Sequence, residues 1–370
     1  MIKKTIVIVF GVRPHFIKLS ALIPELKKKY EVILVHTGQH YDENMFKIFY
    51  SQLEQDLPHH NLSVNGQETH TQQIAQGMLQ LEPILLNINP HWLIVIGDAN
   101  PALIGALVAS KLGIRIVHIE AGSYSTCLTE KSPEETNRRI VDSISDVYFC
   151  PTRIAQQNLI KKGIDKHNFF VGDLLVDVYL SNTNKKDKID REVLQLINKF
   201  IPFNLVTLHR EENLKHSKNL QNIVNALLEL KENIIFPMHP RTKLKLSELG
   251  LLNSLENSTY IKVLKPVSYI DMLNLIKTAK IVLTDSSGLQ REAYIAHTPS
   301  IILRTHNEYP EMINTACSIL AGNDTEKIVN AVKYNMCTLD KSFDRSLFGK
   351  GDTAIKITNI LSEIDLKGDT

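Results

Sequence analysis

Short runs of apolar residues recur along the chain, and each is followed by a turn and then by a segment with helical periodicity. In the first half, such runs occupy residues 5–10, 31–35, 92–96, 115–119, 147–150 and 169–171. In the second half, they occupy residues 205–208, 234–238, 260–263, 281–284 and 300–303. Uninterrupted short apolar runs are typical of strands that are buried on both faces. The alternation of strands and helices therefore predicts an α/β protein with doubly wound parallel sheets.

The chain length predicts two domains, because 370 residues exceed what one hydrophobic core usually covers. Residues 181–190, SNTNKKDKID, are polar and lack periodicity, which indicates a linker. We expect an N-terminal doubly wound domain over 1–180 and a second one over 191–352. A final helix and tail over 353–370 are expected to pack back on the N-terminal domain.

Composition and charge mainly exclude classes of function and location. The net charge of +2 gives no support for binding to nucleic acid or to a membrane surface by bulk electrostatics. No apolar stretch approaches membrane-spanning length, and the N-terminal apolar run is too short for a signal peptide. The cysteines are scattered without zinc-binding spacing. We therefore expect a cytoplasmic protein with reduced thiols and no metal site.

Carboxylates follow two neighbouring strands of the predicted sheet. Asp98 and Glu120 each come just after a buried apolar run. Because the carboxyl ends of parallel strands form the ligand crevice, both side chains should project into one cleft. Glu134 begins the next helix, and Arg138 lies one turn later on the same face. Carboxylates that share a crevice with a cation can differ in pKa and perform acid and base catalysis.

Each of these residues also has a purely structural interpretation. An aspartate after a strand is usually a turn or cap residue, as Asp98 could be. A helical pair such as Glu134 and Arg138 is more often a simple ion pair. Glu120 differs, because a carboxylate that directly follows an apolar strand is buried only if it has a partner.

Two strand-to-helix turns are candidate anion sites. The first strand ends at Gly11 without a GxGxxG sequence, so a dinucleotide fingerprint is absent, but Arg13 and Lys18 follow it. The sequence DSSG at 285–288 opens a helix whose first amides lack intrahelical acceptors, which suits a diphosphate. The alternatives are a solvated helix lysine at position 18 and an ordinary serine N-cap in the second turn.

Eight motifs in one order resemble the non-hydrolysing UDP-N-acetylglucosamine 2-epimerase family. They are GVRPHFIK, TGQHYDENM, VIGDAN, HIEAG, SPEETNRRIVD, TLHREEN, DSSGLQREA and LRTHNEYPE, and they span nearly the whole chain. The resemblance implies two facing Rossmann-like domains of the glycosyltransferase-B architecture. It also implies interconversion of UDP-N-acetylglucosamine and UDP-N-acetylmannosamine without a cofactor, by elimination of UDP to 2-acetamidoglucal and re-addition.

The resemblance further implies roles for individual residues, and a homodimer. The catalytic set that it implies is Asp98, Glu120, Glu134, Arg138, His209 and Lys18. The UDP-binding set is Arg13, His209, Ser286, Ser287, Gly288, Glu292, Arg304 and Glu308. A second UDP-sugar site, which activates some relatives, would include Gln39, His40 and His239. Which carboxylate is the base and which the acid stays open.

The sequence departs from the common family patterns in two places. The arginine of the pattern EAGLR is missing after Gly122, where Ser123 and Tyr124 follow, and the 285–288 turn has an extra serine. These departures leave open a modified substrate, such as UDP-2,3-diacetamido-glucuronate or a UDP-diacetamido-trideoxyhexose. Three further alternatives are a hydrolysing relative, a glycosyltransferase of the same architecture, and a nucleotide-sugar-binding module without catalytic activity.

Overall fold

The computed structural model describes residues 3–38, 57–125, 132–183, 189–307, 309–315, 317–334, 343–344 and 346–367. The chain divides into two compact units. Unit 1 comprises residues 1–180 and 346–370, and unit 2 comprises residues 181–345. The chain returns to unit 1 before residue 353, where the sequence analysis sets the boundary, because the Phe348 carbonyl accepts a hydrogen bond from the Asp173 amide at 2.8 Å.

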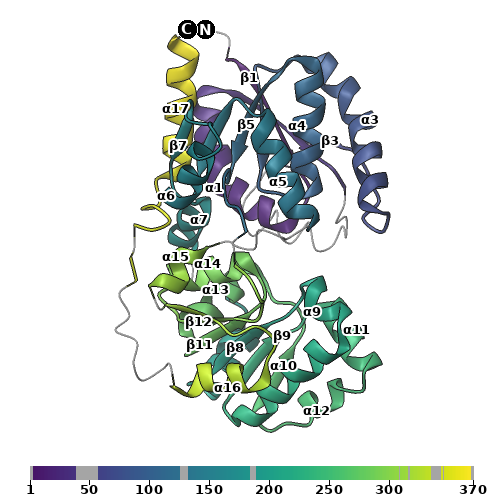
Figure 1. The fold of residues 1–370 in the computed structure, drawn as a ribbon, viewed down its shortest axis with the longest axis vertical. Coiled ribbons are helices and arrows are strands. Elements are labelled where there is room, and N and C mark those ends of the chain that lie inside the picture. The colour runs from purple at the N-terminus through teal and green to yellow at the C-terminus, as the bar shows by residue number, and fades with distance from the viewer. Residues whose placement is uncertain are drawn as a thin grey trace. The chain divides into compact units, whose positions relative to one another are not determined.

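Unit 1 contains a seven-stranded sheet in the order β3-β2-β1-β4-β5-β6-β7, and all of its strand pairs are parallel (Figure 1). The strands are β1 Thr5–Phe10, β2 Glu31–His36, β3 His60–Asn61, β4 Trp92–Ile96, β5 Arg115–Ile119, β6 Val147–Cys150 and β7 Asn168–Phe170. The helices are α1 Arg13–Lys29, α3 His70–Ile88, α4 Asn100–Leu112, α5 Pro133–Ile144, α6 Arg153–Ile160, α7 Leu174–Asn182 and α17 Thr353–Lys367.

Helices cover both faces of this sheet. Alternate residues of β1 face opposite layers, because successive side chains of a strand point to opposite sides. Ile6 and Ile8 belong to the core that α1 and α17 complete. Val7 and Val9 belong to the core that α3 and α4 complete. Burial on both faces explains why the sequence of β1 is continuously apolar.

Helix α17 lies beside α1 (Figure 1) and is fixed at its end by one carboxylate. Asp365 accepts hydrogen bonds from Lys4 Nζ at 3.1 Å, Tyr30 Oη at 2.7 Å and Trp92 Nε1 at 3.1 Å. Its Oδ1 atom also lies 2.6 Å from His91 Nε2. Burial acts to raise the pKa of Asp365, but these hydrogen bonds outweigh burial and lower the pKa below its ordinary value. Asp365 thus links α17 to β1, α1 and β4.

We expect Asp365→Ala to lower the free energy of unfolding by about 2 kcal/mol, because buried donors on Tyr30 and Trp92 lose a charged acceptor. Denaturant unfolding measures this change. Glu363→Ala, at an exposed position of the same helix, is the matched control and should cost little. Equal effects of the two substitutions would contradict this account of α17.

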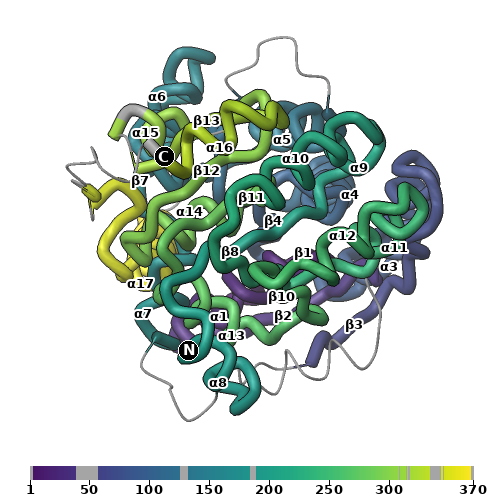
Figure 2. Tube along the Cα trace, turned by 90° about the horizontal axis from the view of Figure 1, so that it is seen from below, coloured from purple at the N-terminus to yellow at the C-terminus, as the bar shows by residue number. Residues whose placement is uncertain are grey.

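Unit 2 repeats the architecture with a six-stranded parallel sheet in the order β10-β9-β8-β11-β12-β13. Its strands are β8 Asn204–Thr207, β9 Ile234–Pro237, β10 Ile261–Leu264, β11 Ile281–Thr284, β12 Ser300–Ile302 and β13 Ser318–Leu320. Its helices are α8 Arg191–Phe200, α9 Glu211–Lys215, α10 Ser217–Leu230, α11 Pro240–Glu248, α12 Leu252–Glu256, α13 Tyr269–Thr278, α14 Ser287–Ile295, α15 Pro310–Asn314 and α16 Thr325–Tyr334. Figure 2 shows α10 and α16 side by side, and their apolar residues share one core with the strands.

The structure confirms the predicted α/β class with doubly wound sheets. Strands β1, β4, β5, β6 and β11 have the predicted bounds, and the other predicted strands are shifted or resized slightly at their ends. Two edge strands, β3 and β13, were missed. β3 is a two-residue polar strand inside a segment that reads as a polar loop, so it carries no apolar signal. In the described parts of the chain, no helix combines the length and apolar character that a membrane span requires.

Candidate active site

Glu120 lies at the end of β5 in a conformation that few side chains adopt. Its φ is +70°, and the amides of Glu120 and Ala121 both donate to the Phe149 carbonyl, at 2.9 and 3.2 Å. This turn directs the carboxylate to Lys18 of α1, whose Nζ lies 2.6 Å from Glu120 Oε1. The Lys18 side chain is only 4% exposed, so it is not a solvated helix lysine. The predicted burial of Glu120 is confirmed, and Lys18 is the partner that burial requires.

His15, which the sequence analysis did not select, lies one turn before Lys18 and is 3% exposed. Burial and the neighbouring Lys18 charge lower the pKa of His15 to about 3, although Glu120 and Asp98 act in the opposite direction. Its Nδ1 atom has no hydrogen-bond partner among the described residues. His15 is therefore a neutral imidazole beside both carboxylates. Its position in the motif GVRPHFIK gave no sign of burial.

The neutral state of His15 makes stability depend on pH. An unfolded histidine has a pKa of about 6.5, so the unfolded chain binds a proton below this pH that the folded protein does not bind. Stability is therefore complete above about pH 6.5 and falls toward pH 3, by at most about 1.4 kcal/mol per pH unit. We expect His15→Asn to weaken this dependence when unfolding free energies are compared at about pH 7.5 and 5.5.

The control for this experiment is His167→Asn. His167 is exposed, and its φ of +49° is a conformation that asparagine tolerates. This variant should keep the pH dependence of the wild type. The interpretation of His15 would be wrong if His15→Asn lost stability with acid as steeply as the control.

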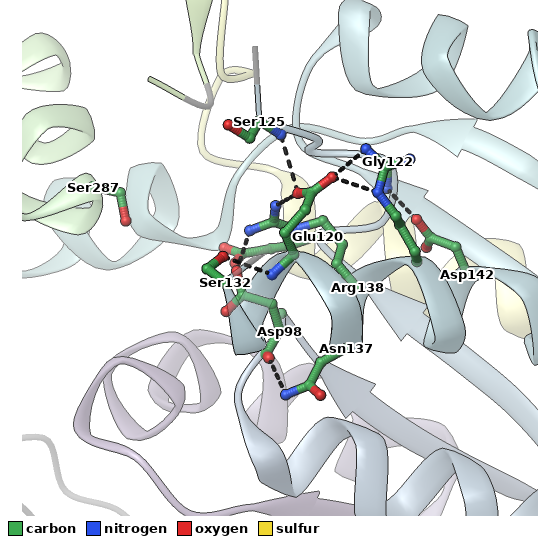
Figure 3. Close-up of polar contacts among 12 residues, drawn as sticks. Asp98, Glu120, Gly122, Ser125, Ser132, Asn137, Arg138, Asp142 and Ser287 are labelled. Carbon is green, nitrogen blue, oxygen red and sulfur yellow. Dashed lines mark hydrogen bonds and ion pairs between the residues drawn. The ribbon is translucent and has the colours of Figure 1, made fainter. Parts of the chain in front are cut away.

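Asp98 follows β4, the strand next to β5, and forms an ion pair with Arg138 Nη2 of α5. Figure 3 shows this group, in which Asn137 Nδ2 also donates to the Asp98 carbonyl at 2.9 Å. Arg138 Nη1 lies 2.7 Å from Glu135 Oε2. The ion pairs described for Arg138 thus join Asp98 to Glu135, and the expected pairing with Glu134 stays a prediction. Residues three apart on a helix are also neighbours, and Glu135 is the buried member of the two glutamates.

Tyr124 stands where the common family pattern has its arginine, and its ring packs against cationic side chains of α5 and of the turn after α6. Its ring lies 4.9 Å from Arg139 Cζ and 3.6 Å from Lys162 Nζ, which is the geometry of cation–π contacts. Asn158 Nδ2 holds the same turn by donating to the Gly122 carbonyl at 3.0 Å. The departure from the pattern is thus accommodated by packing of the turn against two helices.

In unit 2, one buried aspartate joins the ends of two strands. Asp285 follows β11, is fully buried, and accepts the amides of His209 at 3.1 Å and Arg210 at 3.0 Å, which follow β8. Asn213 Nδ2 also donates to Asp285, at 3.1 Å. The His209 side chain remains 39% exposed beside this anchor. Neither Asp285 nor Arg210 was selected from the sequence, although both lie inside quoted motifs.

The start of α14 has the features of an anion site. The Ser286 hydroxyl caps the helix by accepting the Leu289 amide at 3.4 Å, so the N-cap interpretation of this serine is confirmed. The amides of Ser287 and Gly288 lie in the first turn, where intrahelical acceptors are absent. A methyl group on Gly288 would meet only Ser286 Oγ, at 3.8 Å, so the protein leaves space there. Arg210 Nη2 donates to Ser287 Oγ at 3.2 Å and adds positive charge.

Arg304 follows β12 with its side chain 2% exposed. Its Nε lies 4.0 Å from Glu212 Oε2, and its Nη2 lies 2.5 Å from His306 Nε2. Glu292 is buried on α14. Arg13, by contrast, begins α1 and therefore belongs to unit 1, unlike the rest of the predicted UDP-binding set within the described residues.

The residues expected at a second UDP-sugar site are only partly described. Gln39 and His40 lie outside the described residues, as does Glu308 of the predicted UDP-binding set. His239 caps α11, because its Nδ1 accepts the Arg241 amide at 3.2 Å. Its ring lies 6.3 Å from that of His209. Within the described ranges, no three His, Cys, Asp or Glu side chains form a group that could hold a metal ion.

Comparison with known proteins decides the family. The model of the family described as UDP-N-acetylglucosamine 2-epimerase matches residues 24–362. The chain belongs to the UDP-N-acetylglucosamine 2-epimerase family. It is 42% identical to the UDP-N-acetylglucosamine 2-epimerase of Methanococcus maripaludis, over 96% of this chain and 97% of the relative. Another epimerase relative, the UDP-2,3-diacetamido-2,3-dideoxy-D-glucuronate 2-epimerase of Pseudomonas aeruginosa, is 35% identical over 97% of this chain and 99% of its own length.

A solved member of the epimerase family has the same fold. The structure of the Methanocaldococcus jannaschii UDP-GlcNAc 2-epimerase, crystallised with UDP-GlcNAc and UDP, superposes with a TM-score of 0.89 at 39% identity. The match covers 98% of this chain and all of that one. The predicted membership of the epimerase family is therefore confirmed, as is the expectation of an epimerase.

Proposed function

We propose that this chain interconverts UDP-N-acetylglucosamine and UDP-N-acetylmannosamine by inverting C2 of the sugar. The observation that carries the proposal is the pair of carboxylates on adjacent strands of unit 1. Glu120 is paired with Lys18 and Asp98 with Arg138, so each carboxylate is held by a buried cation. Relatives whose names state this activity align over nearly the full chain, which supports the same substrate here.

The chemistry requires groups of the kind that unit 1 supplies. A base removes the proton from C2, the C2 electron pair forms a C1=C2 double bond, and the C1–O bond breaks with its electrons leaving on UDP. The product is 2-acetamidoglucal. UDP then adds back to C1 while an acid returns a proton to the opposite face of C2. Two carboxyl groups with separate positions can serve as base and acid.

We assign proton transfer to Asp98, Glu120 and Glu134. Arg138 holds Asp98, and Lys18 holds Glu120. Positioned cations and amides stabilise a departing diphosphate. In unit 2, we assign this work to the first turn of α14, to Arg210 beside it, and to His209 and Arg304 at the ends of neighbouring strands. The residues of this proposed UDP-binding set are His209, Arg210, Ser286, Ser287, Gly288 and Arg304.

Proton NMR of UDP-N-acetylglucosamine with the purified protein in deuterated water tests the proposal directly. We expect UDP-N-acetylmannosamine to appear together with deuterium at C2, because the returning proton comes from solvent. Accumulation of UDP and free sugar would instead establish a hydrolysing enzyme. No change in the spectrum would exclude this substrate, and turnover of a diacetamido UDP-sugar in the same assay would identify the alternative.

We expect Asp98→Asn, Glu120→Gln and Glu134→Gln each to lower kcat by about 100-fold or more, since a positioned acid or base contributes about 10²- to 10⁴-fold. The same NMR assay measures this loss. Glu82→Gln, at an exposed position on α3, is the control and should turn over like the wild type. A wild-type rate in any of the three variants would remove that residue from the mechanism.

We also propose a homodimer that works in the cytoplasm. Helix α3 presents Leu79 and Leu86, which are 74% and 64% exposed and lie seven residues apart on one face. Cys150 and Cys317, both buried free thiols, fit a reducing compartment.

Light scattering of the double variant Leu79→Glu, Leu86→Glu tests the dimer. We expect a monomer, because two charges would be buried at the contact. A wild-type protein that is itself monomeric at micromolar concentration would refute the dimer. A variant that stays dimeric would show that α3 is not the contact.

A further inference from the structure

A histidine and an aspartate that the proposed chemistry does not use lie buried beneath the carboxylates of unit 1. His118 of β5 is fully buried, and Asp142 of α5 is 1% exposed. His118 Nδ1 lies 2.6 Å from Asp142 Oδ1, and His118 Nε2 lies 2.8 Å from the Gly97 carbonyl oxygen. Asp142 Oδ2 accepts the Gly122 amide at 3.2 Å. Figure 3 shows Asp142 with this contact to Gly122.

The hydrogen-bond partners restrict where the protons lie. A carbonyl oxygen only accepts, so Nε2 of His118 carries a proton that it donates to Gly97. A second proton lies between Nδ1 of His118 and the Asp142 carboxylate. The pair is neutral as a whole, which allows it to be fully buried without leaving an uncompensated charge.

The pair joins the two turns that carry the catalytic carboxylates. Gly97 immediately precedes Asp98, and Gly122 lies two residues after Glu120. The connection from the Gly97 carbonyl through His118 and Asp142 to the Gly122 amide therefore spans both turns. The second turn is the one that needs such support, because Glu120 has a φ of +70°, which strains a residue other than glycine, whereas Gly97 and Gly122 adopt their φ values of +64° and +74° freely. Strained turns persist only where the surroundings hold them.

We propose that His118 and Asp142 are positioning residues that fix Asp98 and Glu120 relative to each other for proton transfer at C2. The inference rests on the proposed epimerase function. A small displacement of a catalytic group can cost about 100-fold in rate even when the binding of substrate is unchanged. The pair should therefore act on kcat and leave KM and the affinity for UDP unaltered.

Two substitutions of Asp142 distinguish the effect of its hydrogen bonds from the effect of its negative charge. In Asp142→Asn, the amide oxygen can accept the Gly122 amide and the amide nitrogen can donate to Nδ1 of a neutral His118, so both of these hydrogen bonds are kept. Asp142→Ala removes both bonds. We expect kcat to fall about 10- to 100-fold in Asp142→Ala and less than about threefold in Asp142→Asn. KM and the calorimetric affinity for UDP should stay within about twofold of wild type in both.

Asp365→Ala is the matched control, since it also removes buried hydrogen bonds from unit 1 but lies on α17. It should lose stability and keep its kcat when all proteins are assayed well below their unfolding temperatures. The proposal is overturned if folded Asp142→Ala has the kcat of this control, or if its loss lies in KM. It is also overturned if Asp142→Asn, which conserves the shape of the site, loses 100-fold. The wild type is assayed first, and absence of C2 exchange there would refute the proposed substrate instead.

Discussion

A buried charge needs an opposite charge placed beside it, and this constraint organises unit 1. Glu120 follows a buried strand, so its carboxylate is stable there only because Lys18 reaches it from α1 at 2.6 Å. Arg138 likewise joins Asp98 to the buried Glu135. The cations come from helices on both faces of the sheet, since α1 and α5 pack on opposite sides. The layers of unit 1 are thus tied together at the candidate carboxylates.

The same architecture carries different chemistry in the two units because different groups follow the strands. In unit 1, the turns after β4 and β5 present carboxylates, which suit proton transfer. In unit 2, the carboxylate of Asp285 is turned inward and satisfied by the amides of His209 and Arg210. What remains at the surface of that turn is positive: the first amides of α14 and the guanidinium of Arg210. With the roles proposed above, one fold thereby provides an acid–base site and an anion site.

The sequence predicted the central strands closely because a strand buried on both faces is mostly apolar: β4 is apolar throughout, and β5 is apolar except at Arg115 and His118. It predicted the candidate carboxylates because strand ends are marked by the same pattern. It did not predict that Lys18 is buried, since the partner that makes burial possible is distant in sequence. Nor did it distinguish Glu134 from Glu135, because both spacings place a carboxylate near Arg138. Long-range pairing, unlike strand position, leaves no local signature.

The pairing of His118 with Asp142 is another long-range contact that the sequence does not reveal. A histidine within an apolar strand looks like a core residue, and an aspartate late in a helix looks like a surface one. Only the fold brings them together, where they connect the turn at Gly97 with the turn that contains Glu120, whose φ of +70° needs support from its surroundings. Because the pair is neutral as a unit, it can provide that support inside the core without adding charge to the field in which Asp98 and Glu120 act. In the proposed mechanism, positioning and electrostatic control of the carboxylates are therefore supplied by separate groups: the His118–Asp142 pair positions them, and Lys18 and Arg138 compensate their charge.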